Sequence, residues 1–264
     1  MSPSIRILFL GDIVGKSGRR AVLKYLEKHK QGADLVIVNV ENAAHGFGVQ
    51  ESHIEELKQA GVHVFTGGNH TFDRKEIFDF IGNYDNVLRP ANYPPKTAGK
   101  GWCVVDVSGT KVGILSVLGR VFMEPLQSPF LVADEAVAEL SKETKIIFVD
   151  FHAEATAEKA AMGAYLDGRV SAVVGTHTHV QTADERILPK GTAFLTDAGC
   201  CATANSIIGM SFEGVKRRII EQLPSRFEVA EGPANATGCI VTVNTETGKA
   251  TAIERVFYSE VGES

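Results

Sequence analysis

Long hydrophobic runs are missing from this sequence of 264 residues. No stretch approaches the ~20 consecutive apolar residues that a membrane-spanning helix needs, so we expect no membrane partner. The first residues, MSPSIRILFLGD, lack a basic region followed by a long apolar core, and they do not predict a signal peptide. A cytoplasmic location is therefore expected.

Long basic runs and paired cysteine motifs are missing as well. The chain has 27 basic and 32 acidic residues, a net charge of −5, and its basic clusters are only pairs, Arg19–Arg20 and Arg217–Arg218. Proteins that bind duplex nucleic acid concentrate lysine and arginine on one face, so long duplexes are not expected partners. The four cysteines share no CxxC spacing, which predicts reduced, partly buried thiols.

What the sequence does have is an ordinary globular composition. Hydrophobic residues make up 44% and charged residues 22%, which excludes disordered and collagen-like chains. A chain of this length can bury enough surface to be stable without disulfides or structural metals. Because no linker or repeat interrupts it, we expect one domain over residues 1–264, and the oligomeric state is left open, a homo-oligomer included.

Short apolar, β-branched runs alternate with helical patterns. This alternation predicts an α/β fold, with antiparallel strands toward the carboxyl end. The predicted strands are Ile5–Leu10, Leu35–Val40, His63–Thr66, Trp102–Val107, Val112–Val117, Ile146–Phe151, Ala172–Val174, Ala193–Thr196, Gly238–Val243 and Thr251–Phe257. The predicted helices are Arg19–His29, Glu51–Ala60, Lys75–Ile81, Asp134–Leu140, Ala155–Tyr165 and Glu213–Gln222.

Acidic, amide and histidine side chains gather where five of these strands end. They are Asp12 after the first strand, Glu41 and Asn42 after the second, Asn69 and His70 after the third, and His152, His177 and His179 at two later ends. Each residue alone has an ordinary explanation as a turn former, a helix cap or a buried histidine. Strand ends in an open α/β sheet meet at one crevice, so the joint pattern predicts a site.

The donor types in this set indicate metal binding. Oxygen and imidazole donors without cysteine suit manganese, iron or zinc. Eight groups exceed the needs of one ion and suit two ions that share a carboxylate. Two such ions stabilise both oxygens of a displacement at phosphorus and generate hydroxide from a water between them.

The motifs resemble those of the calcineurin-like metallophosphoesterases. Along the chain they occur in the order GD, EN, GNH, H and GTHTH. The chain is most similar to the YmdB branch, whose members hydrolyse 2′,3′-cyclic nucleotides and related phosphodiesters. The resemblance runs from LGDIVGKSGRR through ENAAHGFG, GNHTFD and RPANYP to LGRVFM, DFHAEATAEK and GTHTHVQTAD. It implies a single-domain four-layer α/β/β/α sandwich with two metal ions, iron or manganese, with zinc as an alternative.

The resemblance also implies a role for each residue. Asp12, Asn42 and His179 would bind the first metal, and Asn69, His152 and His177 the second. Glu41 stands where the broader family has its bridging aspartate, and Asn42 replaces the histidine of the broader GDxH motif, since this chain has GDIV. His70 would act as the general acid, because histidine can give up a proton near neutrality. The broader family often has an acid after GNH; here Thr71 follows, and Asp73 is the candidate to orient His70.

The sequence therefore predicts a metal-dependent phosphodiesterase in which a metal-bridging hydroxide attacks phosphorus in line. Its substrate would be a small phosphodiester or nucleotide. Two alternatives stay open: a phosphomonoesterase or nucleotidase with the same centre, and a nucleotide-sensing regulatory protein with incidental turnover. Asp150 is either a partner behind the site or a buried cap, and Arg89, Asn92 and Arg120 stand outside the predicted site.

Overall fold

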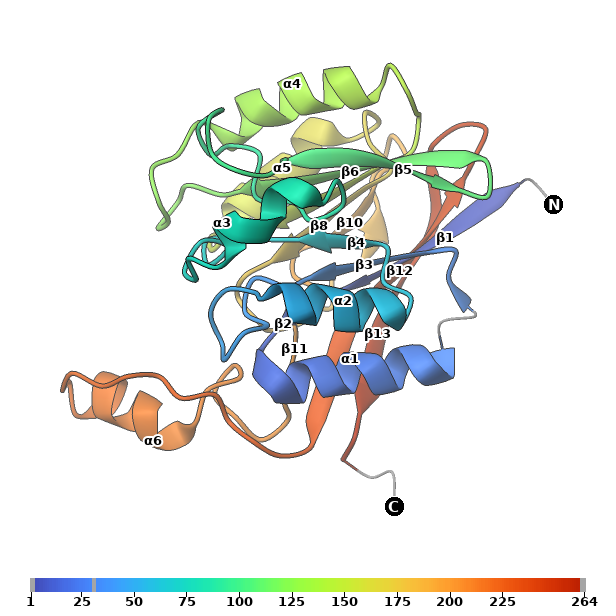
Figure 1. Ribbon diagram of the computed structural model, residues 1–264. Coiled ribbons are helices and arrows are strands. Elements are labelled where there is room, and N and C mark those ends of the chain that lie inside the picture. Colours follow the sequence, from blue (N-terminus) through green and yellow to red (C-terminus); the bar gives the residue numbers. More distant parts are fainter. Residues whose placement is uncertain (1–2, 30–31, 262–264) are drawn as a thin grey trace.

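Two β-sheets face each other, and helices cover their outer faces (Figure 1). The computed structural model describes residues 3–29 and 32–261. The fold predicted from the sequence, an α/β/β/α sandwich, is confirmed. Figure 1 shows α4 and α5 on one side, α1 and α2 on the other, and α6 set apart from the four layers.

The first sheet is mixed. Its order is β2-β11-β12-β1-β3-β4, with β13 paired to β12. Strands β1, β3 and β4 run parallel, whereas β12 is antiparallel to β1, β11 and β13. The strands are β1 (Ser4–Leu10), β2 (Asp12–Ile13), β3 (Leu35–Asn39), β4 (Val64–Thr66), β11 (Cys200–Thr203), β12 (Ala234–Asn244) and β13 (Ala250–Ser259).

The second sheet has a parallel centre and antiparallel edges. Its order is β5-β6-β7-β8-β10-β9, in which β6, β7, β8 and β10 run parallel. The edge strands β5 and β9 are antiparallel to their neighbours. The strands are β5 (Trp102–Val107), β6 (Thr110–Leu118), β7 (Ile147–His152), β8 (Ala172–Thr176), β9 (Arg186–Ile187) and β10 (Ala193–Leu195).

The helices connect these strands. They are α1 (Gly15–His29), α2 (Glu51–Gln59), α3 (Ile77–Phe80), the short η2 (Ile81–Asn83), α4 (Pro129–Leu140), α5 (Thr156–Leu166), α6 (Phe212–Val215) and the π-helical η3 (Lys216–Ile220). None of the helices among the described residues is long and apolar enough to cross a membrane. All four cysteines are free, as expected.

Alternation along β1 explains the layers. Successive side chains of a strand point to opposite faces. Ile7 and Phe9 pack in the core between the sheets, while Leu8 and Leu10 join the core under α1 and α2. A third core lies between the second sheet and helices α4 and α5. Both faces of β1, β3 and β7 are thus covered, as their continuous apolar runs indicate.

The sequence does not predict the shortest strands. Strand β1 ends at Leu10, as predicted, but Gly11 lies against the carbonyl of Gly199 and the chain turns to pair β2 with β11. Asp12 therefore opens β2 instead of ending β1. Strands β2, β9 and β11 are not predicted, since two to four residues give no readable period.

The predicted helices differ mainly at their ends. Helix α1 begins at Gly15 and α4 at Pro129, earlier than predicted, because glycine and proline hide the first turn of a helical pattern. The helix predicted at Lys75–Ile81 is only α3 followed by η2. The one predicted at Glu213–Gln222 is α6 continued by a π-helical turn.

Gly18→Ala is expected to destabilise the fold. Alanine inside a helix normally adds ~0.5–1 kcal/mol of stability over glycine. Here a Cβ would lie 2.0 Å from the carbonyl oxygen of Cys201, so α1 would have to move off β11. We expect a net loss of about 1–3 kcal/mol in urea unfolding. Gly82→Ala is the control, because its Cβ would meet nothing within 4 Å, and an equal loss there would contradict the clash.

Candidate metal centre

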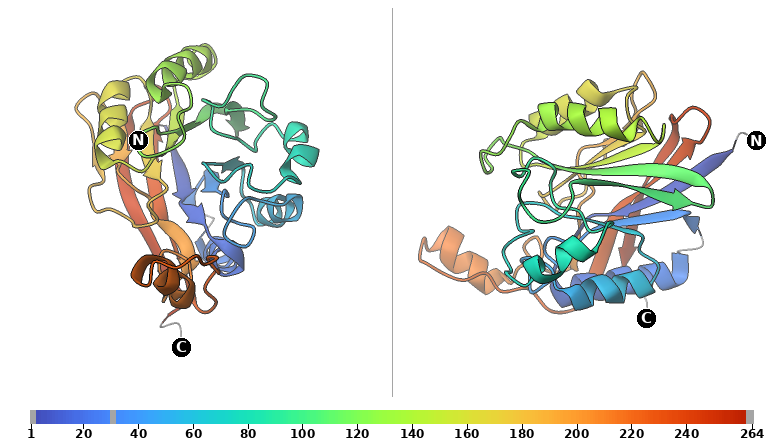
Figure 2. Two further views of the ribbon diagram at one scale, coloured as in Figure 1. Left: turned by 90° about the vertical axis from the view of Figure 1, so that its left-hand side faces the viewer. Right: turned by 45° about the horizontal axis from the view of Figure 1, so that its top comes forward.

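Most of the predicted site residues converge at the carboxyl ends of the central strands. His152 ends β7, and His177 directly follows β8 in the second sheet. Asp12, Glu41 and Asn69 come from the loops and short strands that follow β1, β3 and β4 in the first sheet. The two sheets thus supply opposite sides of one site, at the left edge of the molecule in Figure 1 and facing the reader in the left view of Figure 2.

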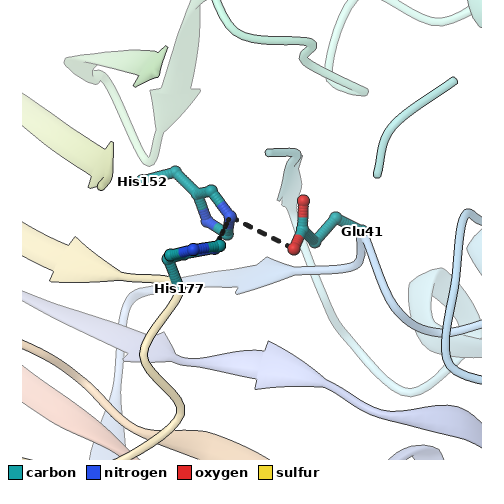
Figure 3. Close-up of side chains that lie close together, drawn as sticks. All are labelled: Glu41, His152 and His177. Atoms are coloured by element: carbon teal, nitrogen blue, oxygen red, sulfur yellow. Dashed lines mark hydrogen bonds and ion pairs between the residues drawn. The ribbon is translucent and has the colours of Figure 1, made fainter. Parts of the chain in front are cut away.

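Glu41, His152 and His177 form the tightest cluster. One ligand atom from each lies within 4.8 Å of the others, and all three side chains point toward one another (Figure 3). His152 Nε2 lies 3.1 Å from Glu41 Oε1 and 3.1 Å from His177 Nδ1. Asn69 Oδ1 joins them at 2.9 Å from His152 Nε2. This set of donors can hold a metal ion.

Asp12, Asn42 and His179 form a neighbouring group. His179 Nε2 lies 3.6 Å from Asp12 Oδ2 and 3.3 Å from Asn42 Nδ2. Asn42 Nδ2 also donates to Glu41 Oε1 at 3.1 Å, so Glu41 stands between the two groups. Exchanging the two amide atoms of Asn42 would turn its oxygen toward the same neighbours.

Each of the three histidines uses its outer nitrogen for a hydrogen bond. His152 Nδ1 donates to Thr176 Oγ1 at 2.9 Å, and His177 Nε2 donates to Glu154 Oε2 at 3.0 Å. His179 Nδ1 donates to the backbone carbonyl of Ile208 at 2.9 Å. With the outer nitrogens engaged in this way, the inner nitrogens face the cluster, and each can offer a lone pair to a cation when its imidazole is neutral. Such bonding is typical of histidines that bind metals.

Asp150 holds the histidine of β7 through a threonine. Thr176 Oγ1, which accepts from His152, donates in turn to Asp150 Oδ1 at 2.7 Å. Asp150 Oδ2 accepts from Asn39 Nδ2 at 3.0 Å and from Thr66 Oγ1 at 2.5 Å. Of the two roles considered for Asp150, the contacts favour the partner behind the site.

The loop 177–179 has a strained backbone that is held by hydrogen bonds to Asp12 and Asp197. His177 and His179 have φ angles of 97° and 65°. The His177 amide donates to Asp12 Oδ2 at 2.8 Å, and Thr178 donates to Asp197 through both its amide and its hydroxyl. Asp197 is itself paired with buried Lys159 at 2.6 Å. These bonds stabilise the left-handed backbone that points both imidazoles inward.

His70 lies at the rim of the cluster. Its amide donates to Glu41 Oε2 at 2.9 Å, and its Nδ1 lies 2.7 Å from Asp73 Oδ2. Phe47 packs edge-on against the imidazole, with ring centroids 4.9 Å apart. Thr71 instead closes the turn by bonding the backbone of Gly68, so Asp73 is the residue that orients His70.

The protein atoms fit a cation. Asp12 Oδ1 and Asn42 Oδ1 are buried acceptors without a hydrogen-bond partner. Burial raises the pKa of Asp12 to about 7, although His152 and His179 lower it. Burial and the neighbouring His152 lower the pKa of His177 to about 3, which keeps its imidazole neutral, the form that binds metals. A bound cation would satisfy the orphan oxygen of Asp12, and that of Asn42 once its amide atoms are exchanged, and would offset the buried negative charge.

The cluster opens into a cavity of about 350 Å³. A larger cavity of about 780 Å³ lies between β5 and α4, but none of the predicted site residues lines it. Arg89, which does line it, donates to the carbonyls of Pro90 and Ala91 and has a structural role. Asn92 is likewise buried and bonds the backbone of Leu118. Of these two cavities, the smaller one adjoins the candidate metal centre.

The sequence reasoning does not predict every contact at the site. Glu154 was missed although it follows His152 by two residues, a spacing that offered a signal. The carbonyl of Ile208 has no sequence signal at all, because any residue carries a carbonyl and only the fold brings this one to His179.

Comparison with known proteins agrees with the geometry. The model of the family described as YmdB-like protein matches residues 8–256. The chain belongs to the YmdB-like family. A Bacillus subtilis protein named 2′,3′-cyclic-nucleotide 2′-phosphodiesterase is 50% identical over 258 residues, which cover 97% of this chain and 98% of that protein.

Two solved structures superpose closely on this chain. A hypothetical protein from Thermus thermophilus superposes with a TM-score of 0.92 at 41% identity, covering 97% of this chain and all of that one. A protein described as a novel phosphatase from Mycoplasma pneumoniae gives 0.91 at 38% identity, covering 98% and 95%. The predicted family is therefore confirmed, and its named relatives are phosphodiesterases and phosphatases, which are hydrolases.

Thr176→Val is expected to weaken metal binding. The change keeps the shape of the side chain but removes the hydroxyl between His152 and Asp150. Loss of such an outer contact typically costs 10–100-fold in metal affinity, and a titration of chelator-treated protein with Mn²⁺ would measure it. Thr192→Val is the matched control, since that buried hydroxyl bonds the carbonyl of Val170 at the other end of the sheet. Equal losses of metal affinity in both variants would argue against a role of the hydrogen bonds from His152 through Thr176 to Asp150.

Proposed function

We propose that this protein is a metal-dependent phosphodiesterase that hydrolyses small phosphodiesters such as 2′,3′-cyclic nucleotides. The observation that carries the proposal is the convergence of three imidazoles, each bonded through its outer nitrogen, with two buried carboxylates. Of this group, Glu41, His177 and His179 line one cavity. The name of the Bacillus subtilis relative supports the same substrate class.

In this proposal the residues divide between two ions. Asp12, Asn42 and His179 would hold the first; Asn69, His152 and His177 the second. Glu41 would touch both, since it lies between the two groups. The donor set suits iron or manganese, with zinc as an alternative. When bound, a pair of such cations withdraws charge from phosphoryl oxygens and lowers the pKa of a water between them.

His70 is proposed to protonate the departing ribose oxygen. Its Nδ1 is engaged by Asp73, which leaves Nε2 for the substrate. The imidazole lines the cavity, and Phe47 limits its rotation. The amide of His70 also bonds Glu41, so the acid is held at a fixed position relative to the metal cluster. A positioned donor of this kind contributes ~10²–10⁴-fold to turnover.

Hydrolysis of phosphomonoesters is the second candidate. The same donors would serve it, and the Mycoplasma pneumoniae relative is described as a phosphatase. A diester needs a proton on an alkoxide leaving group, and so does a monoester of an alcohol. The two functions therefore differ only in how the cavity receives the rest of the substrate.

Metal removal is expected to abolish hydrolysis of 2′,3′-cyclic AMP, and Mn²⁺ or Fe²⁺ to restore it. We expect two ions per chain by elemental analysis. Glu41→Ala should lower the affinity for both ions, whereas Asn42→Ala should lower mainly one, because the Glu41 carboxylate contacts members of both groups. A wild-type chain with a single tightly held ion would contradict the two-ion arrangement. Monoester hydrolysis without diester hydrolysis would favour the second candidate.

His70→Ala is expected to lower turnover of a 2′,3′-cyclic nucleotide by about 10²–10⁴-fold. A nitrophenyl ester needs little protonation of its leaving group, so its turnover should fall much less. Asp73→Asn should give a smaller loss in the same direction, because it weakens only the contact that orients His70. If both substrates slow equally and metal content drops, His70 is a ligand or a structural residue.

A further inference from the structure

The cavity at the metal cluster has two unlike sides. The polar side is formed by Glu41, Asn42, His70, Glu154, His177, Thr178 and His179. The opposite side is almost wholly apolar and comes mainly from residues 204–233, the crossover segment between β11 and β12. Its cavity-lining residues are Ile207, Ile208, Met210, Val215, Ile219 and Phe227.

The crossover segment is anchored to the body of the protein. Met210 and Val215 pack with Val14, which follows Asp12, and Phe47 joins this small core from the loop after Asn42. In Figure 1 the segment carries α6 and extends beyond the four layers on the side where the strands end. The apolar side is therefore held at a fixed place opposite the metal cluster.

Ile208 sits at the strained tip of a tight turn in this segment. Ile207 and Met210 exchange two backbone hydrogen bonds of 2.9 Å, and Ile208 and Gly209 between them have φ angles of 48° and 98°. This conformation favours Asn-Gly, and a β-branched residue there is a true outlier. Isoleucine at this position gives the cavity an apolar wall while its carbonyl holds His179.

Several isoleucines here are exposed without a protein partner that would bury them. Ile208 is 50% exposed and Ile219 is 66% exposed, although both line the cavity. A substrate whose phosphate lay at the cluster would bring its remaining atoms against these side chains. A flat, apolar group would cover them, and the volume of about 350 Å³ suits one nucleotide.

We propose that the apolar side of this cavity, with Ile208, Ile219 and Phe47, binds the nucleobase of a single nucleotide. The proposal rests on the function proposed above and adds the determinant of substrate preference. Bases of any kind have an apolar face, so the wall selects for the presence of a base and not for its identity. Neither lysine nor arginine is among the residues that line the cavity, which agrees with a mononucleotide, since a longer strand would add phosphates that need cations.

Ile219→Ala and Ile220→Ala make a matched test. Both side chains are 66% exposed on η3, but only Ile219 lines the cavity. The substrates are 2′,3′-cyclic AMP and the cyclic phosphate of methyl riboside, which has no base. We expect the wild type to favour cyclic AMP in kcat/KM, Ile219→Ala to lower that preference about 3- to 10-fold through KM, and Ile220→Ala to leave it unchanged.

Ile208→Asn is a second variant that removes part of the apolar side without an expected loss of stability. Asparagine tolerates the turn better than isoleucine, so the melting temperature should not fall, while the preference for the base should drop. Equal kcat/KM of the wild type on both substrates, or equal effects of Ile219→Ala and Ile220→Ala, would overturn the proposal.

Equilibrium binding separates this inference from the proposed function. In calorimetry on metal-loaded protein, 3′-AMP should bind more tightly than ribose 3-phosphate, and Ile219→Ala should reduce the difference. If neither cyclic phosphate is cleaved but this difference persists, the phosphodiesterase fails and the base site stands. If cyclic AMP is cleaved and the difference is absent, the base site fails and the phosphodiesterase stands.

Discussion

The carboxylate of Asp150 joins the two sheets at the point where the candidate centre forms. It is fully buried and receives hydrogen bonds from Asn39 and Thr66 of the first sheet and from Thr176 of the second. Burial raises the pKa of Asp150, while the charge of His152 and these three bonds lower it. Each of the three donors would cost ~1–3 kcal/mol if left buried without a partner. The arrangement therefore fixes the spacing of the sheets from which both halves of the site extend.

Three separate parts of the structure fix the three imidazoles. His152 is held by Thr176 within the second sheet. His177 is held by Glu154 in the loop between β7 and α5, and His179 by the carbonyl of Ile208 in the crossover segment. The geometry of the proposed metal centre consequently depends on the sheet, the loop and the crossover segment together. The same crossover segment forms the apolar side of the cavity, so the residues proposed to contact the substrate and the carbonyl that orients a proposed metal ligand belong to one element.

The sequence predicts the fold and the convergence of the polar side chains, because both depend on local patterns. Continuous apolar runs mark β1, β3 and β7, and polar residues follow each run where a parallel strand ends. Prediction from the sequence fails where a structural feature depends on contact between residues far apart in the chain. Asp12 opens β2 because Gly11 meets Gly199, and no pattern around Asp12 announces that contact. The carbonyl of Ile208 is invisible for a related reason, since backbone groups acquire a role only from the fold.

Three residues with a strained backbone line the cavity. His177, His179 and Ile208 all have positive φ angles, and together they connect the metal cluster with its apolar wall. Histidine tolerates this conformation better than most residues, but isoleucine does not, and strain of this kind costs about 1–3 kcal/mol. Glycine or asparagine at Ile208 would relieve it while leaving the carbonyl bond to His179 possible. Stability therefore does not explain an isoleucine at this turn, whereas the proposed contact of its apolar side chain with a nucleobase would.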